Sequence, residues 1–119
     1  MICQYCNNNA MLINSKKIYG IDYGMMYYCK NCGASVGVHK KTLKPLGTLA
    51  NQKLRELRKK THRVFDRYWK GGKYSRAFCY NRLATKLDID SSRCHIAMFD
   101  ENMCEKVIEI CTRKKHAFL

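Results

Sequence analysis

Hydrophobic residues follow two different patterns along this chain. In the first third they fall in short runs at residues 10–14, 16–19, 25–28 and 34–39, which have the length and composition of strands. A turn bracketed by two glycines lies between the second and third of these runs. We therefore expect a small antiparallel sheet in the N-terminal third.

From residue 49 onward, apolar residues recur every three to four positions, as on one face of a helix. A helix over residues 49–69 is expected to begin after Thr48 as its N-cap and to end before Gly71. Trp69 ends the apolar face, and we expect its side chain to be largely buried. The other members of this face are Ala50, Leu54, Leu57, Thr61, Val64, Phe65 and Tyr68.

Shorter helices are expected to follow over residues 76–87, in a short stretch ending at Met98, and over residues 101–113. Ser75 and Asp100 are the expected N-caps of the first and last of these helices. Residues 82–99 also have the spacing of a helix-turn-helix motif, although many helical hairpins satisfy the same pattern.

Two Cys-x-x-Cys pairs, Cys3 with Cys6 and Cys29 with Cys32, are separated by twenty-two residues. In each pair one turn of backbone aims two thiolates at one ion, and two pairs complete a tetrahedral shell that is closed to water. The spacing predicts a zinc ribbon with one structural Zn²⁺, in which Gly33 takes a positive φ. Two redox pairs or two disulfides are the alternatives.

The expected fold is α+β. An N-terminal zinc ribbon, built on a small antiparallel sheet, is followed by a long amphipathic basic helix and a small C-terminal helical module. We expect the ribbon and its connector in residues 1–48 and the helical module in residues 49–119, packed as one compact unit. A ribbon of about forty residues buries too little surface to fold without its metal.

The remaining cysteines lack the Cys-x-x-Cys spacing and lie mostly on apolar helix faces, so we expect buried thiols there. A second metal site that also uses His95 and His116 is the alternative. These cysteines are Cys79, Cys94, Cys104 and Cys111.

Positive charge is concentrated in one part of the chain. The net charge is +14, and residues 40–73 contribute +10 of it, with twelve bases against Glu56 and Asp66. Charge confined to one element is typical of a polyanion-binding surface, whereas a solvated helix face usually mixes in acids. The expected contacts to nucleic acid, or to an acidic surface of a host protein, are Lys53, Arg55, Lys59, Lys60, Arg63, Arg67 and Lys70.

Arg58, His62 and Asp66 follow one another at four-residue spacing, which places them on neighbouring turns of the same helix. They form either a catalytic or phosphate-gripping group or a structural network, and we favour the structural interpretation. His39 and His95 complete the candidate polar network. We expect His39 to pack or to hydrogen-bond rather than to bind zinc, because four thiolates already fill the metal site.

The N-terminus lacks the basic and apolar regions of a secretory signal, and no apolar run approaches the roughly 18 residues that span a membrane. We therefore expect a protein of the reducing cytoplasm with no membrane partner.

Seven stretches of the sequence carry a resemblance to a known family: Cys3-x-x-Cys6, Tyr19-Gly20-x-x-Tyr23-Gly24-Met25, Cys29-x-x-Cys32, Val36-Gly37-Val38-His39, Pro45-Leu46-Gly47-Thr48-Leu49-Ala50, His62-x-x-Phe65-Asp66 and Cys94-His95-Ile96-Ala97-Met98-Phe99-Asp100. Together they make the chain resemble a family of small phage and prophage proteins known by a zinc-finger-containing domain of unknown function. The resemblance implies a phage-type source, hence the cytoplasm of a host cell, and a zinc ribbon joined to helices. It implies no particular activity.

The leading functional hypothesis is a non-catalytic protein that binds nucleic acid, with DNA favoured, through the basic helix. The alternative is a protein-interaction module that inhibits or redirects a host nucleic-acid-handling or defence complex, because a basic helix suits an acidic protein groove as well as a phosphate backbone. A nuclease is the third hypothesis, which requires His39, His62, Asp66 and His95 to converge. The sequence lacks the clustered carboxylates of a two-metal site, so we favour a non-enzymatic role.

Overall fold

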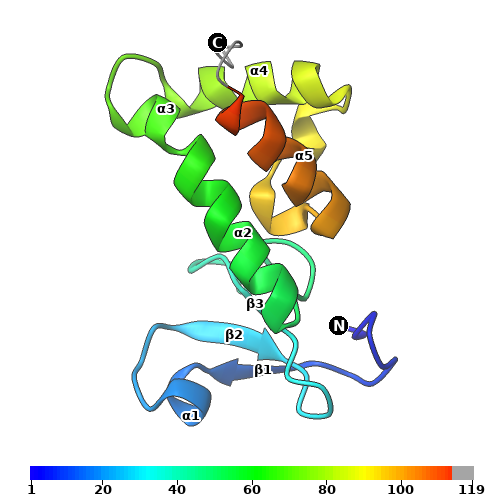
Figure 1. Cartoon of the computed structure of the whole chain (residues 1–119). Coiled ribbons are helices and arrows are strands. Elements are labelled where there is room, and N and C mark those ends of the chain that lie inside the picture. Colours follow the sequence, from blue (N-terminus) through cyan, green and yellow to red (C-terminus); the bar gives the residue numbers. More distant parts are fainter. Residues whose placement is uncertain (114–119) are drawn as a thin grey trace. The chain divides into compact units, whose positions relative to one another are not determined.

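The computed structural model describes residues 1–113 of the chain (Figure 1). The last six residues of the predicted helical module, which include His116, therefore lie outside the described residues. The chain divides into two compact units, Met1–Arg55 and Glu56–Leu119, and each is described by itself. The predicted α+β class is confirmed, since a small antiparallel sheet comes first and helices follow it.

The first unit contains a three-stranded antiparallel sheet in the order β1-β2-β3. Its register pairs Met11 with Tyr28 and Met26 with Gly37. The sheet confirms three of the four expected strand runs. The strands are β1 (Met11–Asn14), β2 (Met25–Tyr28) and β3 (Ser35–Gly37).

The remaining run, residues 16–19, was expected to be a strand, and this prediction is wrong. It forms the short helix α1 (Lys16–Tyr19), which ends at Gly20 with a left-handed φ of 74°. The Asn14 side chain accepts a hydrogen bond from the Lys16 N–H at 2.9 Å, and the Ser15 hydroxyl accepts one from the Tyr23 N–H at 2.7 Å. Such local side-chain bonds compete with strand pairing and favour a turn.

The core of the first unit is thin and contains two of the expected zinc ligands. Cys3 and Cys29 are fully buried together with a few small or medium apolar side chains. Because so little apolar surface is available, the cysteines themselves occupy the centre of this core. The accompanying core residues are Ala10, Ala34, Val36 and Leu49.

The basic helix is shorter than residues 49–69 and is followed by a separate turn of helix. Helix α2 (Gln52–Phe65) is capped by Asn51, whose side-chain oxygen accepts a hydrogen bond from the Leu54 N–H at 3.0 Å. The prediction that Thr48 is the N-cap of this helix is therefore wrong. Ala50 exchanges two backbone hydrogen bonds with Ser35, so the chain is still extended at that point.

Helix α3 (Arg67–Lys70) follows α2 after a break at Asp66. Its end is followed by a loop through Gly72, where φ is 81°. The expected long helix is thus divided into α2 and α3, although its buried face over residues 54–65 is largely as expected.

In the second unit, α4 (Arg76–Leu87) and α5 (Glu101–Thr112) confirm the expected helices and their N-caps. The Ser75 hydroxyl accepts from the Phe78 N–H, and the Asp100 carboxylate accepts from the Met103 N–H. These helices bury a core that includes Phe65, Leu83, Ile96 and Val107.

The segment between α4 and α5 contains two separate 3-10 turns, η1 (Ser91–Arg93) and η2 (Ile96–Met98). The prediction of a single short helix there is wrong. The helix-turn-helix interpretation is wrong as well, because neither turn is long enough to serve as a recognition helix. Asp88 takes the left-handed position after α4, with φ 54°, and closes that helix through its N–H.

Within residues 1–113, no helix combines the length and the apolar character needed to cross a membrane.

Replacing Phe65 with alanine should lower the free energy of unfolding by about 3–5 kcal/mol, the usual cost of deleting a buried aromatic side chain. Phe65 is fully buried, and its ring meets that of Tyr80 edge to face, with centroids 4.8 Å apart. Urea denaturation followed by far-ultraviolet circular dichroism measures this change. Met98→Ala is the control, because that side chain is 43% exposed and its loss should cost less than about 1 kcal/mol. Equal effects of the two substitutions would contradict the assigned core.

Candidate metal centre and basic surface

The first Cys-x-x-Cys pair lies in a tight turn closed by two backbone hydrogen bonds. The Cys3 N–H donates to the Asn8 carbonyl oxygen at 2.8 Å, and the Asn7 N–H donates to the Cys3 carbonyl oxygen at 2.8 Å. Asn7 takes a left-handed φ of 63°, a conformation that asparagine tolerates better than most residues. The turn brings the thiols of Cys3 and Cys6 to the same side.

The second pair repeats this turn residue for residue. The Cys29 N–H donates to the Ala34 carbonyl oxygen at 2.8 Å, and the Gly33 N–H donates to the Cys29 carbonyl oxygen at 2.7 Å. Gly33 has a φ of 80°, as predicted from its position after Cys32. The two turns are therefore equivalent knuckles that present two thiols each.

A third turn of the same kind lies at residues 39–44 and carries no thiol. The His39 N–H donates to the Lys44 carbonyl oxygen at 2.8 Å, the Leu43 N–H donates to the His39 carbonyl oxygen at 2.9 Å, and Leu43 has a φ of 58°. His39 is exposed here, in the position that the first cysteine takes in each knuckle. This turn displays Lys40, Lys41 and Lys44, all of them exposed.

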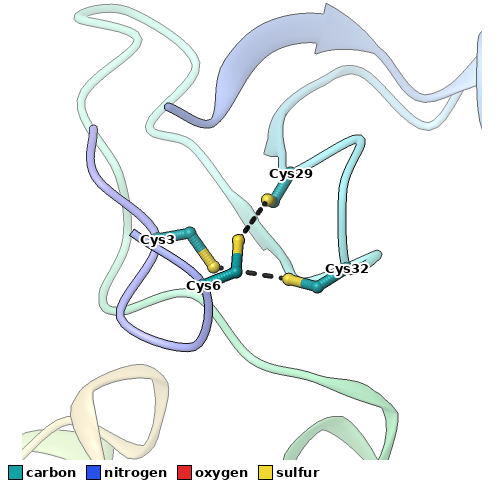
Figure 2. Close-up of side chains that lie close together, drawn as sticks. All are labelled: Cys3, Cys6, Cys29 and Cys32. Atoms are coloured by element: carbon teal, nitrogen blue, oxygen red, sulfur yellow. Dashed lines mark hydrogen bonds between the residues drawn. The ribbon is translucent and has the colours of Figure 1, made fainter. Parts of the chain in front are cut away.

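The four thiols converge from the two knuckles, as Figure 2 shows. The Sγ atoms of Cys3 and Cys32 are 3.4 Å apart, as are those of Cys6 and Cys29, and all four lie within 4.8 Å of one another. A tetrahedral shell with Zn–S bonds of about 2.3 Å places its sulfur atoms about 3.8 Å apart. The arrangement fits one structural Zn²⁺.

The surroundings of these thiols also suit a cation. The side-chain amide and backbone N–H of Asn8 hydrogen-bond to the Cys6 sulfur and lower the pKa of Cys6 to about 6. The Ala34 N–H lowers the pKa of Cys32, but desolvation and the neighbouring thiols outweigh it and raise that pKa to about 12. A bound divalent cation stabilises the thiolate form of its ligands and so removes the penalty on ionisation of Cys32.

Each knuckle is also held to the segment that begins α2. On the first knuckle, the Gln4 side chain donates to the Leu49 carbonyl oxygen at 2.6 Å, and the Tyr5 hydroxyl accepts from the Asn51 N–H at 3.3 Å. On the second, Arg55 Nη1 donates to the carbonyl oxygen of Gly33 and to the hydroxyl of Ser35, both at 3.0 Å. The metal centre therefore fixes the start of α2.

The other four cysteines are buried thiols, as expected. Burial raises the pKa of Cys94 to about 11, and it raises the pKa of Cys111 to the same value, so neither thiol is ionised near neutral pH. Cys79 and Cys104 are fully buried as well. Among residues 1–113, the side chains that gather in a group able to hold a metal are those of the two knuckles.

Five of the seven bases expected to contact a partner fall into two groups in the structure. Lys59, Lys60 and Arg63 on α2 are exposed and have no hydrogen bond or ion pair to any described residue. Arg55 is half-buried and bonded to the second knuckle, and Arg67 donates to the Cys111 carbonyl oxygen.

The two remaining bases of the predicted set are exposed lysines. Lys53 lies in the first turn of α2. Lys70 ends α3, with its Nζ 5.9 Å from the centroid of the Trp69 ring.

The candidate polar network is only partly assembled. His62 Nδ1 and an Asp66 carboxylate oxygen are 3.0 Å apart, and the other Asp66 oxygen accepts a hydrogen bond from Trp69 Nε1 at 3.2 Å. Arg58 is buried and donates from Nε to the Phe99 carbonyl oxygen at 3.0 Å, while His95 lies 6.2 Å from the Tyr80 ring. The Asp66 carboxylate thus links His62 to Trp69.

A cluster of aromatic and basic side chains around α3 and α4 was not predicted from the sequence. Tyr74 and Phe78 stack with centroids 5.5 Å apart and an interplanar angle of 14°. Lys73 lies over Tyr74, and Arg76 lies over both Trp69 and Tyr80. The available sequence signal was that residues 67–87 contain six bases and no acid.

Comparison with known families finds one match that covers nearly the whole chain. A family model described as a zinc-finger-containing domain matches residues 1–114. Comparisons with curated proteins and with solved structures gave no match.

We expect one zinc ion per chain, and we expect zinc affinity to fall as the pH falls. Affinity falls because the zinc ligands must be ionised. Cys32, whose pKa is about 12 without metal, must lose its proton when zinc binds, so protons compete with the metal. Elemental analysis gives the stoichiometry, and calorimetry in buffers of different ionisation enthalpy counts the protons released. Cys29→Ala should lose the zinc, whereas Cys79→Ala, which alters a thiol outside the group, should keep it. A stoichiometry near two would refute this assignment.

Arg55→Gln should lower the free energy of unfolding by about 1.5–3 kcal/mol, because it removes charge-assisted hydrogen bonds to the second knuckle. Zinc release in urea, followed with a colorimetric chelator, measures the change. Lys59→Gln is the matched control on the same helix and should change the value by less than about 0.5 kcal/mol. If both substitutions have the same effect, Arg55 does not brace the knuckle.

Proposed function

The chain belongs to the zinc-finger-containing domain family, and from that premise we propose that it is a non-catalytic protein that binds nucleic acid, with DNA favoured, through the exposed bases of α2. Zinc has a structural role in this proposal. Four thiolates close the tetrahedral shell and leave no position for a substrate or a reactive water.

The observation that carries the proposal is the group formed by Lys59, Lys60 and Arg63. These side chains are exposed on neighbouring turns of α2 and form no ion pair with a described residue. A folded protein gains little stability from unpaired charges of one sign held close together, because they repel one another. A phosphate backbone removes that repulsion and releases its own counterions in exchange.

The charge distribution supports the same ligand class. Residues 40–73 carry +10 of the net charge of +14, including the lysines of the third turn at residues 39–44. Phosphate contacts of this kind are independent of base sequence, since phosphates are alike along a strand. We therefore expect binding without strong sequence preference and with a steep dependence on salt.

A protein-interaction module is the second candidate function, and an exposed apolar cluster of the first unit favours it. Tyr19 and Tyr23 meet edge to face with centroids 6.2 Å apart, and they are 51% and 73% exposed. Ile18 and Ile21 in the same segment are 41% and 57% exposed. Exposed apolar groups of this kind are typical of protein contacts, so a phage product of this type could use them to inhibit or redirect a host nucleic-acid-handling or defence complex.

The nuclease hypothesis gains no support from the site geometry. Of the residues that it requires, His62 and Asp66 are hydrogen-bonded to each other, but Asp66 also holds Trp69. His95 lies instead against the Tyr80 ring. The pair of His62 and Asp66 is more simply a structural contact at the end of α2.

Neutralising the three free bases should reduce the salt dependence of binding while folding is unchanged. For the variant Lys59→Gln, Lys60→Gln and Arg63→Gln, the slope of log affinity against log salt concentration should fall by about 0.7–0.9 for each lost phosphate contact. Glutamine has nearly the same helix propensity as lysine and arginine, so thermal melts should be alike. Fluorescence anisotropy with labelled DNA at several salt concentrations measures the slope.

The matched control is the variant Lys86→Gln, Arg93→Gln and Lys106→Gln, which removes the same charge from other exposed positions of the second unit. It should leave the slope near that of the parent. If both variants reduce the slope equally, general charge and not the α2 surface governs binding. If the parent has no salt-dependent affinity for nucleic acid, the protein-interaction function replaces this proposal.

A further inference from the structure

The second unit holds a stacked pair of aromatic rings, of which Phe78 is exposed and Tyr74 is half-buried. Phe78 is 44% exposed on α4, whereas Cys79, Tyr80 and Leu83 of the same helix are buried. Tyr74 precedes the helix by two residues and stacks on Phe78 at 5.5 Å and 14°. We call the rings of Tyr74 and Phe78 the aromatic platform.

The position of the platform is fixed by the start of α4. The Ser75 hydroxyl accepts a hydrogen bond from the Phe78 N–H at 3.0 Å, so the backbone between the two rings is held by the helix cap. A rigid, partly exposed ring needs little further ordering when a flat ligand stacks on it, so the entropic cost of binding is small.

One cation lies over the platform, and a second lies over two neighbouring rings of the same unit. Lys73 Nζ is 5.4 Å from the Tyr74 ring centroid, and Arg76 is held 5.9 Å from the Trp69 ring and 4.7 Å from the Tyr80 ring. Residues 67–87 contain six bases and no acid. Trp69, expected to be largely buried, is instead half-buried beside these cations.

A flat apolar ring bordered by cations matches the chemistry of a nucleotide that is not base-paired. Its base has an exposed π-face that can stack on an aromatic side chain, and its phosphate can meet the cations at the edge. Bases inside a duplex already stack on their neighbours and cannot offer that face. An exposed apolar patch alone could suit a protein partner, but Lys73 over the platform and the six bases of residues 67–87 favour a polyanion.

We propose that the aromatic platform stacks an unpaired base, which makes single-stranded nucleic acid the preferred ligand class of this protein. The inference rests on the nucleic-acid binding proposed above and adds a contact to bases that the α2 lysines and arginine cannot supply. The basic side chains of α2 set the affinity for phosphate, and the platform distinguishes single strands from duplexes.

The test compares two labelled probes of equal length and charge: an oligothymidylate and an abasic strand with the same phosphate backbone. Fluorescence anisotropy titrations at one salt concentration give both affinities for the full, zinc-loaded chain. The parent protein should bind the oligothymidylate about tenfold more tightly, within the range known for stacking of one base on an aromatic side chain. Phe78→Ala should remove this preference and leave affinity for the abasic strand unchanged.

Three variants separate stacking from a structural role of the ring. Phe78→Trp keeps an aromatic ring and should keep the preference, whereas Phe78→Leu keeps apolar contact and should lose it. Met98→Ala, which alters a side chain of similar exposure in the same unit, should behave as the parent. Circular dichroism melts confirm that each variant is folded.

Each outcome decides between the two proposals. Equal affinity of the parent for both probes overturns the platform inference but leaves phosphate binding by α2 standing. A preference that survives in Phe78→Ala also overturns it, because the bases are then recognised elsewhere. Failure of the parent to bind either probe at low salt overturns the platform inference, and failure to bind labelled duplex DNA as well overturns the proposed function itself.

Discussion

Four thiolates that share one divalent cation are the constraint on which the first unit depends. Cys3 and Cys29 are both zinc ligands and fully buried members of a thin core, so loss of the metal removes a cross-link and disturbs the packing together. Without the cation, desolvation and the neighbouring thiols outweigh the hydrogen bond from the Ala34 N–H and raise the pKa of Cys32. Metal binding and folding of this unit are therefore one event.

The order created at the metal centre extends into the start of α2. Gln4 and Tyr5 of the first knuckle and Arg55 bonded to the second all contact the segment that leads into this helix. Asn51 then caps the helix, and the exposed bases follow on the next turns. The zinc site thus fixes where the basic helix begins.

Arginine and lysine have different tasks in this chain. Arg55, Arg58 and Arg67 each donate to backbone carbonyl oxygens, where a planar guanidinium can satisfy fixed acceptors. The lysines of α2, with Arg63, remain in solvent, where a flexible stem and a compact charge suit phosphates of varying position. A count of positive charge over residues 52–70 therefore includes three guanidinium groups that already bond to backbone carbonyl oxygens.

The sequence by itself determined the metal ligands, the α+β class, the strands that border the knuckles and the buried face of the basic helix. These follow from local spacing: Cys-x-x-Cys turns, positive φ after a knuckle, and apolar residues at helical intervals. Tertiary structure alone decided that Ala50 pairs with Ser35 and delays the helix, and that Arg55 and Arg67 bond to backbone carbonyl oxygens. Those features depend on which distant backbone groups need a partner, and sequence spacing carries no record of that.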